Sequence, residues 1–254
     1  MSVLPLSVRF ALWGTAALHG VCSPQDAVEA AHQDVDDVAG DPAGQLASWR
    51  DFGETALLVA LPRPGDAAGM PRAGFAEIGA AAAAGECVFV AGFGGLLVPH
   101  LSRFGPIGDE GTLATWTAYE AEPVPRHELE SLSLGELDRE LTVAVHDSSA
   151  ALERVEGRPW SSEPRGLAER RLAPRDLDLP SGVSGRALRL LLSAARAAVI
   201  VDEGLRLAAS GPTLDLFSSG RRESGLRDLQ RTTGRVLAGA TNLAVMELAD
   251  WRPA

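Results

Sequence analysis

The sequence predicts an α+β protein, with a small, mostly antiparallel sheet and flanking helices followed by a C-terminal bundle of about three long helices. Two observations predict this fold class. Short apolar runs that end at Gly or Pro, which are typical of strands, occur before residue 121. Beyond residues 123–126 (PVPR), the long apolar segments have the spacing of helices. We therefore expect a sheet domain over residues 1–125 and a helical domain over residues 126–254, or a single core that both halves share.

The first predicted elements are two helices and a turn. Residues 23–26 (SPQD) combine a Ser cap, a Pro and an acid, which start a short helix that ends near residue 32. Residues 34–37 (DVDD) predict a turn or a weak strand. Their carboxylates could bind a divalent cation, but the spacing matches no EF-hand loop, so a solvated turn is favoured. Before them, four apolar residues at helical spacing predict an amphipathic helix: Leu6, Phe10, Trp13 and Ala17.

The strands of the sheet are predicted next, together with one helix. The small-residue run over residues 74–84 predicts a helix that ends at Gly85. Residues 92–95 (GFGG) are the nearest match to a phosphate-binding loop, but a strand follows them instead of a helix, so a tight hairpin is favoured. The apolar runs that predict strands are residues 55–62, 86–91, 96–101 and 112–120.

The C-terminal half predicts three long helices and one long connection. The helices run from Ser131 or Ser133 to about residue 155, over residues 185–210, and over residues 225–250. Residues 157–182 contain four prolines and predict an irregular connection. A connection of this length could cover a pocket or reach a partner. Trp160 within it is a candidate anchor for a partner, although a cap over the bundle core is favoured.

One acid is out of place on the helix over residues 185–210. Asp202 falls in the middle of its apolar face, where a carboxylate must be paired, hydrogen-bonded or protonated. Arg206 lies one turn on and is the expected partner. The favoured interpretations are a structural Asp–Arg pair or a helix face that emerges into solvent near the helix end. The alternative is that Asp202 is part of a polar pocket between helices.

Glu247 is a second acid on an apolar stripe, in the last helix. If the last two helices form an antiparallel hairpin about residue 217, Glu247 lies near Arg186 or Arg189, and Asp202 lies near Thr232 or Thr233. This placement gives both acids a partner and favours structural pairing over an active site.

Composition excludes several classes of partner and of chemistry. The formal net charge of −11 disfavours binding to nucleic acids and to anionic membranes. All 23 basic residues are Arg, which excludes Lys-based catalysis. The charges of residues 185–210 disfavour a membrane span, and Arg9, inside the first apolar run, disfavours a signal peptide. Two distant cysteines predict no disulfide framework and a cytoplasmic location.

No cofactor or metal is predicted. The sequence has no Walker, GxSxG, HExxH or CxxC pattern, and none of its five histidines has ligand spacing with another His, Cys or acid. His146 lies off the apolar stripe of its helix and is expected to face solvent.

Residues 61–90 (LPRPGDAAGMPRAGFAEIGAAAAAGECVFV), followed by an LDREL-type helix at residues 137–141, carry a resemblance. This pattern resembles a group of hypothetical proteins from high-GC actinobacteria. The resemblance implies a cytosolic bacterial origin and carries no activity or catalytic residue across.

Two function classes follow from these observations. The leading hypothesis is a non-catalytic binding or interaction protein that uses a bundle or sheet face to meet a protein partner or another copy of itself. The alternative is an enzyme on a small polar or cationic substrate, in which Asp202 and Glu247 are buried acids with Arg189, Arg196 and Arg206 nearby. A closed, salt-bridged Asp202 would contradict the enzyme, whereas an open pocket in which the pKa of Asp202 is raised would support it. Regulation of transcription is least favoured because no basic recognition helix is predicted.

Overall fold

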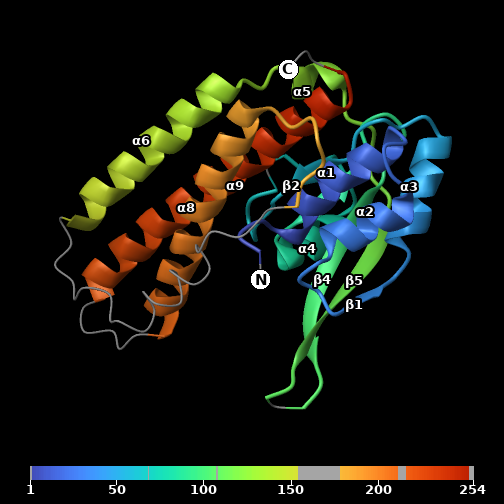
Figure 1. The fold of residues 1–254 in the computed structure, drawn as a ribbon. Helices are drawn as coiled ribbons and strands as arrows, with labels where there is room; N and C mark the ends of the chain where they lie inside the picture. The colour runs from blue at the N-terminus through green and yellow to red at the C-terminus, as the bar shows by residue number, and fades with distance from the viewer. Residues whose placement is uncertain (1, 68, 107, 154–177, 211–215, 252–254) are drawn as a thin grey trace.

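A five-stranded sheet forms the N-terminal half of the protein, with the strand order β1-β5-β4-β3-β2. The computed structural model describes residues 2–67, 69–106, 108–153, 178–210 and 216–251. Strands β2 to β5 pair antiparallel in chain order, and β1 lies parallel to β5 at one edge (Figure 1). The predicted mostly antiparallel sheet is therefore confirmed. The strands are β1 (Asp37–Ala39), β2 (Leu58–Ala60), β3 (Cys87–Phe89), β4 (Leu96–Phe104) and β5 (Gly111–Tyr119).

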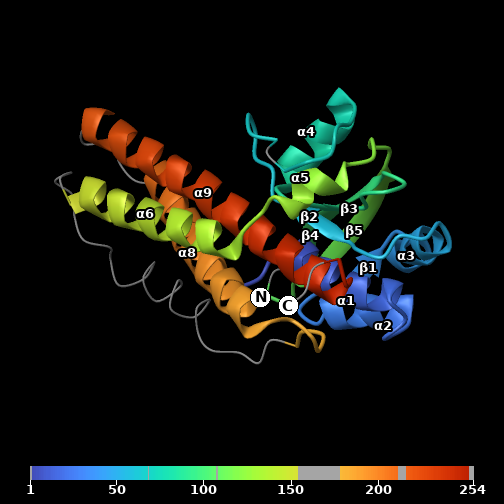
Figure 2. The same cartoon turned by 90° about the horizontal axis from the view of Figure 1, so that it is seen from above.

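Helices cover both faces of this sheet. Figure 2 shows α1 (Leu6–Leu18) and α2 (Pro24–Ala31) on one side and α4 (Phe75–Ala84) on the other. The expected helix at the position of α1 is confirmed, but its expected amphipathic character is wrong. Almost every residue of α1 is buried, because α2, the sheet and a C-terminal helix contact different sides of it.

The local signals that start and end helices act as expected in α2 and α4. Ser23 forms a capping box with Asp26, and α4 ends at Gly85 with a φ of 78°. Asp41 and Pro42 form a similar start signal for α3 (Pro42–Asp51), a helix that the sequence analysis missed. The short helix α5 (Arg126–Glu130) was missed as well.

The GFGG segment joins β3 to β4, which are antiparallel neighbours, so the hairpin is confirmed. The backbone N–H of Phe93 donates to Oε1 of Glu54, which fixes this turn. Pro99 is tolerated within β4 because β3 pairs only with Leu96 and Leu97, which leaves that edge of β4 without a ladder at Pro99. Past the residues of β5 that pair with β1, β4 and β5 continue as a two-stranded ribbon that projects from the sheet (Figure 1).

The C-terminal half is the expected set of three long helices, α6 (Leu134–Glu153), α8 (Gly185–Ser210) and α9 (Leu216–Leu248). Helices α8 and α9 pack against each other as an antiparallel pair, and α6 packs on both (Figure 1). Helix α9 begins nine residues earlier than expected, since Gly220 and Gly225 lie inside it instead of ending a loop. Most of the predicted connection over residues 157–182, including Trp160, lies outside the described residues. Within the described part of the chain, no helix combines the length and the apolarity that crossing a membrane requires.

Helix α9 connects the two halves of the molecule. Its Asn242 side chain accepts a hydrogen bond from Val59 N at 2.8 Å through Oδ1 and donates one to Val59 O at 3.0 Å through Nδ2. The amide thus takes the place of a further strand at the edge of β2. Around it, one cluster of buried apolar side chains includes Leu57 of the sheet half and Leu237 and Met246 of α9. The domain boundary at residues 125 and 126 stays a prediction.

Candidate functional site

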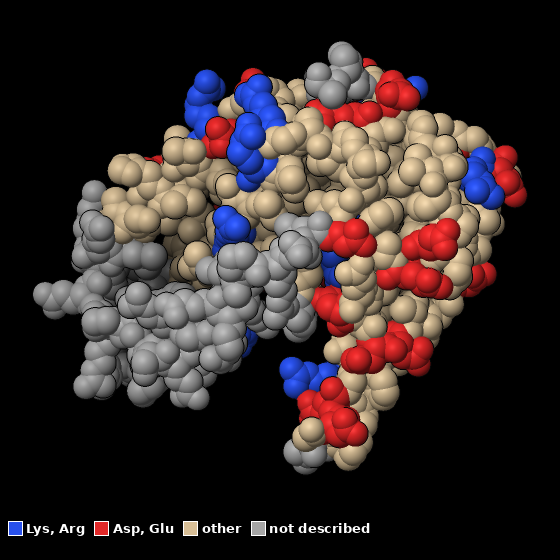
Figure 3. Space-filling view, in the orientation of Figure 1, with Lys and Arg blue, Asp and Glu red and all other residues tan. Residues whose placement is uncertain are grey.

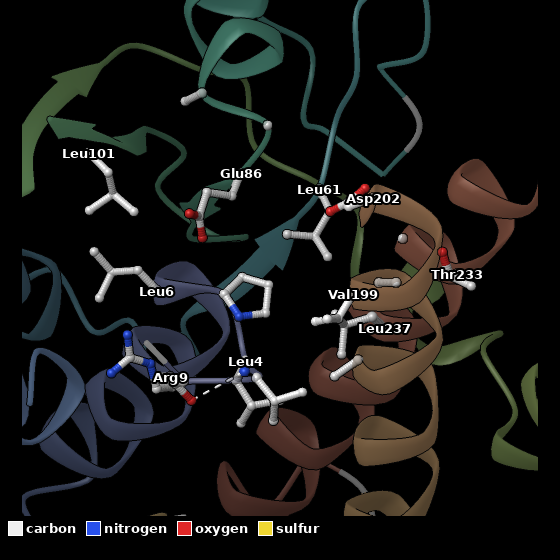
Figure 4. Close-up of a pocket in the computed structure, with 18 of the residues that line it drawn as sticks. Leu4, Leu6, Arg9, Leu61, Glu86, Leu101, Val199, Asp202, Thr233 and Leu237 are labelled. Atoms are coloured by element: carbon white, nitrogen blue, oxygen red, sulfur yellow. Dashed lines mark hydrogen bonds between the residues drawn. The ribbon is translucent and has the colours of Figure 1, made fainter. Parts of the chain in front are cut away.

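A cavity of about 220 Å³ lies where the sheet half meets the bundle. One wall is formed by residues 2–6 and Arg9, with Asp34 beside them, and the opposite wall by one face each of α8 and α9. Figure 4 shows Arg9 on one side of the cavity and Asp202 and Thr233 on the other, with Leu4, Leu61 and Val199 between them. The cavity therefore has an apolar middle and a polar group of residues at each end.

The first polar end is built around Arg9, whose side chain is only 10% exposed. Its Nη2 lies 2.5 Å from Oδ1 of Asp34, while Oδ2 of Asp34 accepts the backbone N–H of Ser2 at 2.5 Å. Burial alone would raise the pKa of Asp34. The charge of Arg9 and the hydrogen bond from Ser2 outweigh it, so the pKa of Asp34 lies below its usual value. The pair is held as ions.

Glu86, just before β3, places a second acid in the cavity wall. Its Oε2 accepts the backbone N–H of Ser7 at 2.8 Å, in the first turn of α1, where the helix leaves donors without intrahelical partners. Burial raises the pKa of Glu86, and the hydrogen bonds from Ser7 and the charges of Arg9 and Arg63 offset this only in part. Glu86 thus holds a proton more readily than an exposed carboxyl group does.

The second polar end contains Asp202, the acid that the sequence singled out. It is half-buried, and its Oδ1 accepts a hydrogen bond from Nε2 of Gln230 at 2.6 Å. The expected partner Arg206 pairs instead with Glu203, whose side chain is only 6% exposed. Glu203 is buried on α8, which packs against both α9 and α6. The expected nearness of Asp202 and Thr233 is confirmed by the cavity that both line.

The other predicted site residues do not join this cavity. Glu247 is half-buried, and its Oε2 is buried without a hydrogen-bond partner among the described residues. Arg189 is exposed, and no ion pair within the described part of the chain joins Glu247 to Arg186 or Arg189. The expected pairing is therefore wrong. Trp160 lies outside the described residues.

The sequence analysis missed most of the cavity's polar residues. Arg9 carried a usable signal, since it is a charged residue inside an otherwise apolar helix that proves buried on nearly all sides. Asp34 and Glu86 carried none, because a carboxylate in a turn or beside a strand is usually solvated. Gln230 is an ordinary polar residue of a helix, and the packing of α8 on α9 brings it to the cavity.

His32 is a buried histidine close to this region, and its contacts point to a structural role. The indole N–H of Trp116 donates to Nε2 of His32 at 2.8 Å, so Nδ1 carries the proton and donates to the carbonyl of Val28 at 2.6 Å. Burial lowers the pKa of His32 and favours this neutral form. Among the residues that the structure describes, no group of three His, Cys, Asp or Glu side chains is arranged to hold a metal ion.

The face of the molecule drawn in Figure 3 is unevenly charged. Figure 3 shows acidic side chains over much of the sheet half on this face, with few basic ones among them. This distribution follows the net charge of −11.

Comparison with known proteins gives two family matches. The model of the Rv1486c-like protein N-terminal domain matches residues 7–129, and that of the C-terminal domain matches residues 135–238. The two models follow each other in order and together cover most of the chain. The family's name points to mycobacterial relatives, as the resemblance to actinobacterial proteins implied. No curated protein and no solved structure matches the chain.

Proposed function

We propose that this chain, which belongs to the family of Rv1486c-like proteins, is a non-catalytic binding protein that holds a small molecule in the cavity between its two halves. The observation that carries the proposal is the make-up of the cavity wall. An apolar middle with a few convergent polar groups is the usual composition of a small-molecule site. Both halves contribute to this wall, so ligand binding would also stabilise their packing.

The state of the polar groups supports binding over catalysis. Arg9 and Asp34 are committed to each other, and Glu86 accepts from the first turn of α1. Groups fixed in this way can orient a ligand, but they are poorly placed to exchange protons with it.

Native mass spectrometry of the purified full chain tests this proposal. We expect a stoichiometric extra mass on the wild type that is absent from Val199→Trp, a variant that fills the cavity. The matched control is Val143→Trp on α6, where the side chain is 51% exposed, and this variant should keep the extra mass. An extra mass that all three proteins carry, or a clean mass for each of them, would contradict a ligand in this cavity.

The native mass spectra also test whether the protein is an interaction protein, in which a face of the bundle or of the sheet binds a protein partner or a second copy of the chain. A dimer or tetramer without any adduct would favour that form. We propose no nucleic-acid or membrane partner, in keeping with the acidic surface.

An enzyme on a small polar or cationic substrate is the second candidate. It is favoured by Asp202, which lines an open cavity and has an amide instead of an arginine as its hydrogen-bond partner, and by the raised pKa of Glu86. A bound mass that changes on incubation in the wild type, but not in Glu86→Gln, would put the enzyme ahead of the binding protein.

We also propose a cytoplasmic location. Cys22 is half-buried and Cys87 is buried, and both are free thiols. Burial raises the pKa of Cys87 to about 12, so this thiol stays protonated at neutral pH.

A further inference from the structure

We infer that the ligand of the cavity is a primary amine with a short apolar body, and that its ammonium group binds the carboxylate of Asp202. This inference rests on the proposed function and adds the chemical class of the ligand to it. It starts from the charges in the cavity wall, because the carboxylate at the α8–α9 end has no cationic partner among the described residues.

The charged residues of the wall are two arginines and three acids. Arg9 is taken up by its ion pair with Asp34. The charge of Arg63, on the segment that follows β2, acts on Glu86. Each arginine therefore faces an acid of the sheet half, and Asp202 on α8 is left as the acid of the wall without a cation.

The neighbours of Asp202 on α8 and α9 do not supply a cation either. Arg206 pairs with Glu203, and Oδ1 of Asp202 accepts from the neutral amide of Gln230. Within the described part of the chain, no hydrogen bond or ion pair occupies Oδ2 of Asp202, and this atom is not closed off from solvent. Figure 4 shows the carboxylate directed toward Leu61, which lies across the cavity. Oδ2 is therefore a charged acceptor that a ligand in the cavity can reach.

A primary ammonium group matches this acceptor. It has a positive charge and three N–H donors, so it forms a charge-assisted hydrogen bond with Oδ2. Because Asp202 is only half-buried, water meets the other two donors and the desolvation cost stays small. A carboxylate head would be repelled by Asp202, and a neutral head would leave its charge uncompensated. A metal ion needs several ligands, and no group of three suitable side chains is arranged for one in the described ranges.

The rest of the cavity fits an apolar body. Beside Asp202 the wall is formed by Leu61 and Val199, with Leu237 of α9 and Leu4 next to them (Figure 4). These side chains offer no hydrogen bonds, so a short alkyl chain that extends from the ammonium group gains by leaving water there.

The arginines at the other end supply the competing possibility. If Arg9 or Arg63 recognised the ligand instead, the preferred head would be an anion. Probes of equal length that differ in the charge of the head distinguish the two ends of the cavity.

The test titrates the full-length protein with hexylamine, hexanamide and hexanoate. Binding is followed by NMR on protein labelled with ¹⁵N-glutamine, because the side-chain NH₂ of Gln230 reports on Asp202 through their hydrogen bond. The chain has four glutamines, so the loss of one signal in Gln230→Met assigns it. We expect hexylamine to shift the Gln230 signal and to bind at least about tenfold more tightly than the other two, the ratio that one charge-assisted hydrogen bond supplies.

The informative variant is Asp202→Asn, which removes the charge, keeps the size of the side chain and still accepts from Gln230 through its amide oxygen. This variant should bind the alkyl chain but lose the preference for hexylamine. The matched control is Asp228→Asn on α9, an exposed acid paired with Arg231, and it should keep the preference. Val199→Trp, which fills the cavity, should bind none of the probes.

Each other outcome overturns the inference in a recognisable way. A preference for hexylamine that Asp202→Asn retains, or a Gln230 signal that hexylamine leaves unmoved, would show that the amine binds elsewhere on the acidic protein. Tightest binding by hexanoate would place the head at the arginines, and equal binding of the probes or tightest binding by hexanamide would show that the charge of Asp202 plays no part. If no probe binds and the native mass spectra show no adduct, the proposed function fails together with the inference. If the adduct is present and no probe binds, only the ligand class is wrong.

Discussion

At the scale of single residues, Asn242 shows how one side chain can complete a sheet. The edge of β2 that faces away from β3 would leave the N–H and C=O of Val59 buried without partners. Both are met by the amide of Asn242, itself only 6% exposed. A carboxamide has one donor group and one acceptor on the same carbon, so it can take the place of a neighbouring backbone peptide group.

Replacement of Asn242 by Ala should therefore lower the free energy of unfolding by about 2–4 kcal/mol, since two buried backbone groups lose their partners. Urea denaturation followed by circular dichroism measures this change. The control is Arg231→Ala on the same helix, which removes an exposed ion pair with Asp228 and should change stability by less than about 0.5 kcal/mol. Equal effects of the two substitutions would contradict the role assigned to Asn242.

Single residues also show where reasoning from the sequence fails. Asp202 was correctly singled out as a polar residue among apolar ones, but its partner was not Arg206. Both candidate partners lie within reach of a carboxylate, one on its own helix and one on α9. Which of the two pairs with Asp202 depends on the rotation of α8 relative to α9. The spacing of apolar residues along one helix does not predict that rotation.

At the scale of elements, the start of α9 shows that a glycine need not end a helix. Gly220 and Gly225 lie inside α9, where the packing of a long helix outweighs the propensity of two residues. Neither glycine has positive φ, and a Cβ atom placed on either would meet no atom of the described residues within 4 Å. The two glycines therefore lower the stability of α9, and no close packing contact requires a glycine at either position.

Gly220→Ala and Gly225→Ala should each raise the free energy of unfolding by about 0.5–1 kcal/mol, because alanine loses less backbone entropy in a helix. The control is Gly14→Ala in α1, where the new Cβ atom would lie 2.5 Å from Cδ2 of Leu57. We expect this substitution to lower the free energy of unfolding, because the core has no room for the added atom. Thermal unfolding of the three variants measures these shifts. Destabilisation at residues 220 and 225 would mean that α9 does not extend to Leu216.

The helices and strands that were predicted well are those whose ends or periodicity depend on residues close together in the sequence. A capping serine with proline, a terminal glycine and alternating apolar runs act over a few residues, so α2, α4 and the strands lie where they were expected. Helix α3 was missed despite its own capping signal, Asp41 with Pro42. The burial of α1 on nearly all sides could not be read locally, because it depends on contacts with α9, which lies far along the chain.

At the scale of the whole molecule, the two halves share one apolar cluster. Helix α9 packs on α1 and β2 as well as on α6 and α8. A second, smaller cluster of Val201, Leu226 and Leu229 lies toward the far end of the bundle. Separation of the two halves would expose buried apolar side chains of the main cluster to water.

We expect the full chain to unfold in urea in one transition. Tryptophan fluorescence reports chiefly on the sheet half, through Trp13, Trp49 and Trp116, and far-ultraviolet circular dichroism reports chiefly on the long helices. Because α9 belongs to both, the midpoints of the two curves should coincide. Separate midpoints would instead support independent domains that meet near residues 125 and 126.

The sequence by itself determined the fold class, the order and type of most elements, and the presence of a polar residue at position 202 among apolar ones. These features depend on propensity, capping and periodicity, which are properties of neighbouring residues. Only the tertiary structure decided that Arg9, Asp34 and Glu86 meet Asp202 and Gln230 around one cavity. Those residues are up to 221 positions apart, from Arg9 to Gln230, and they meet because α9 returns across the sheet half. The physical reason is that a cavity is set by how elements pack, and that packing is fixed by the shape of a shared core.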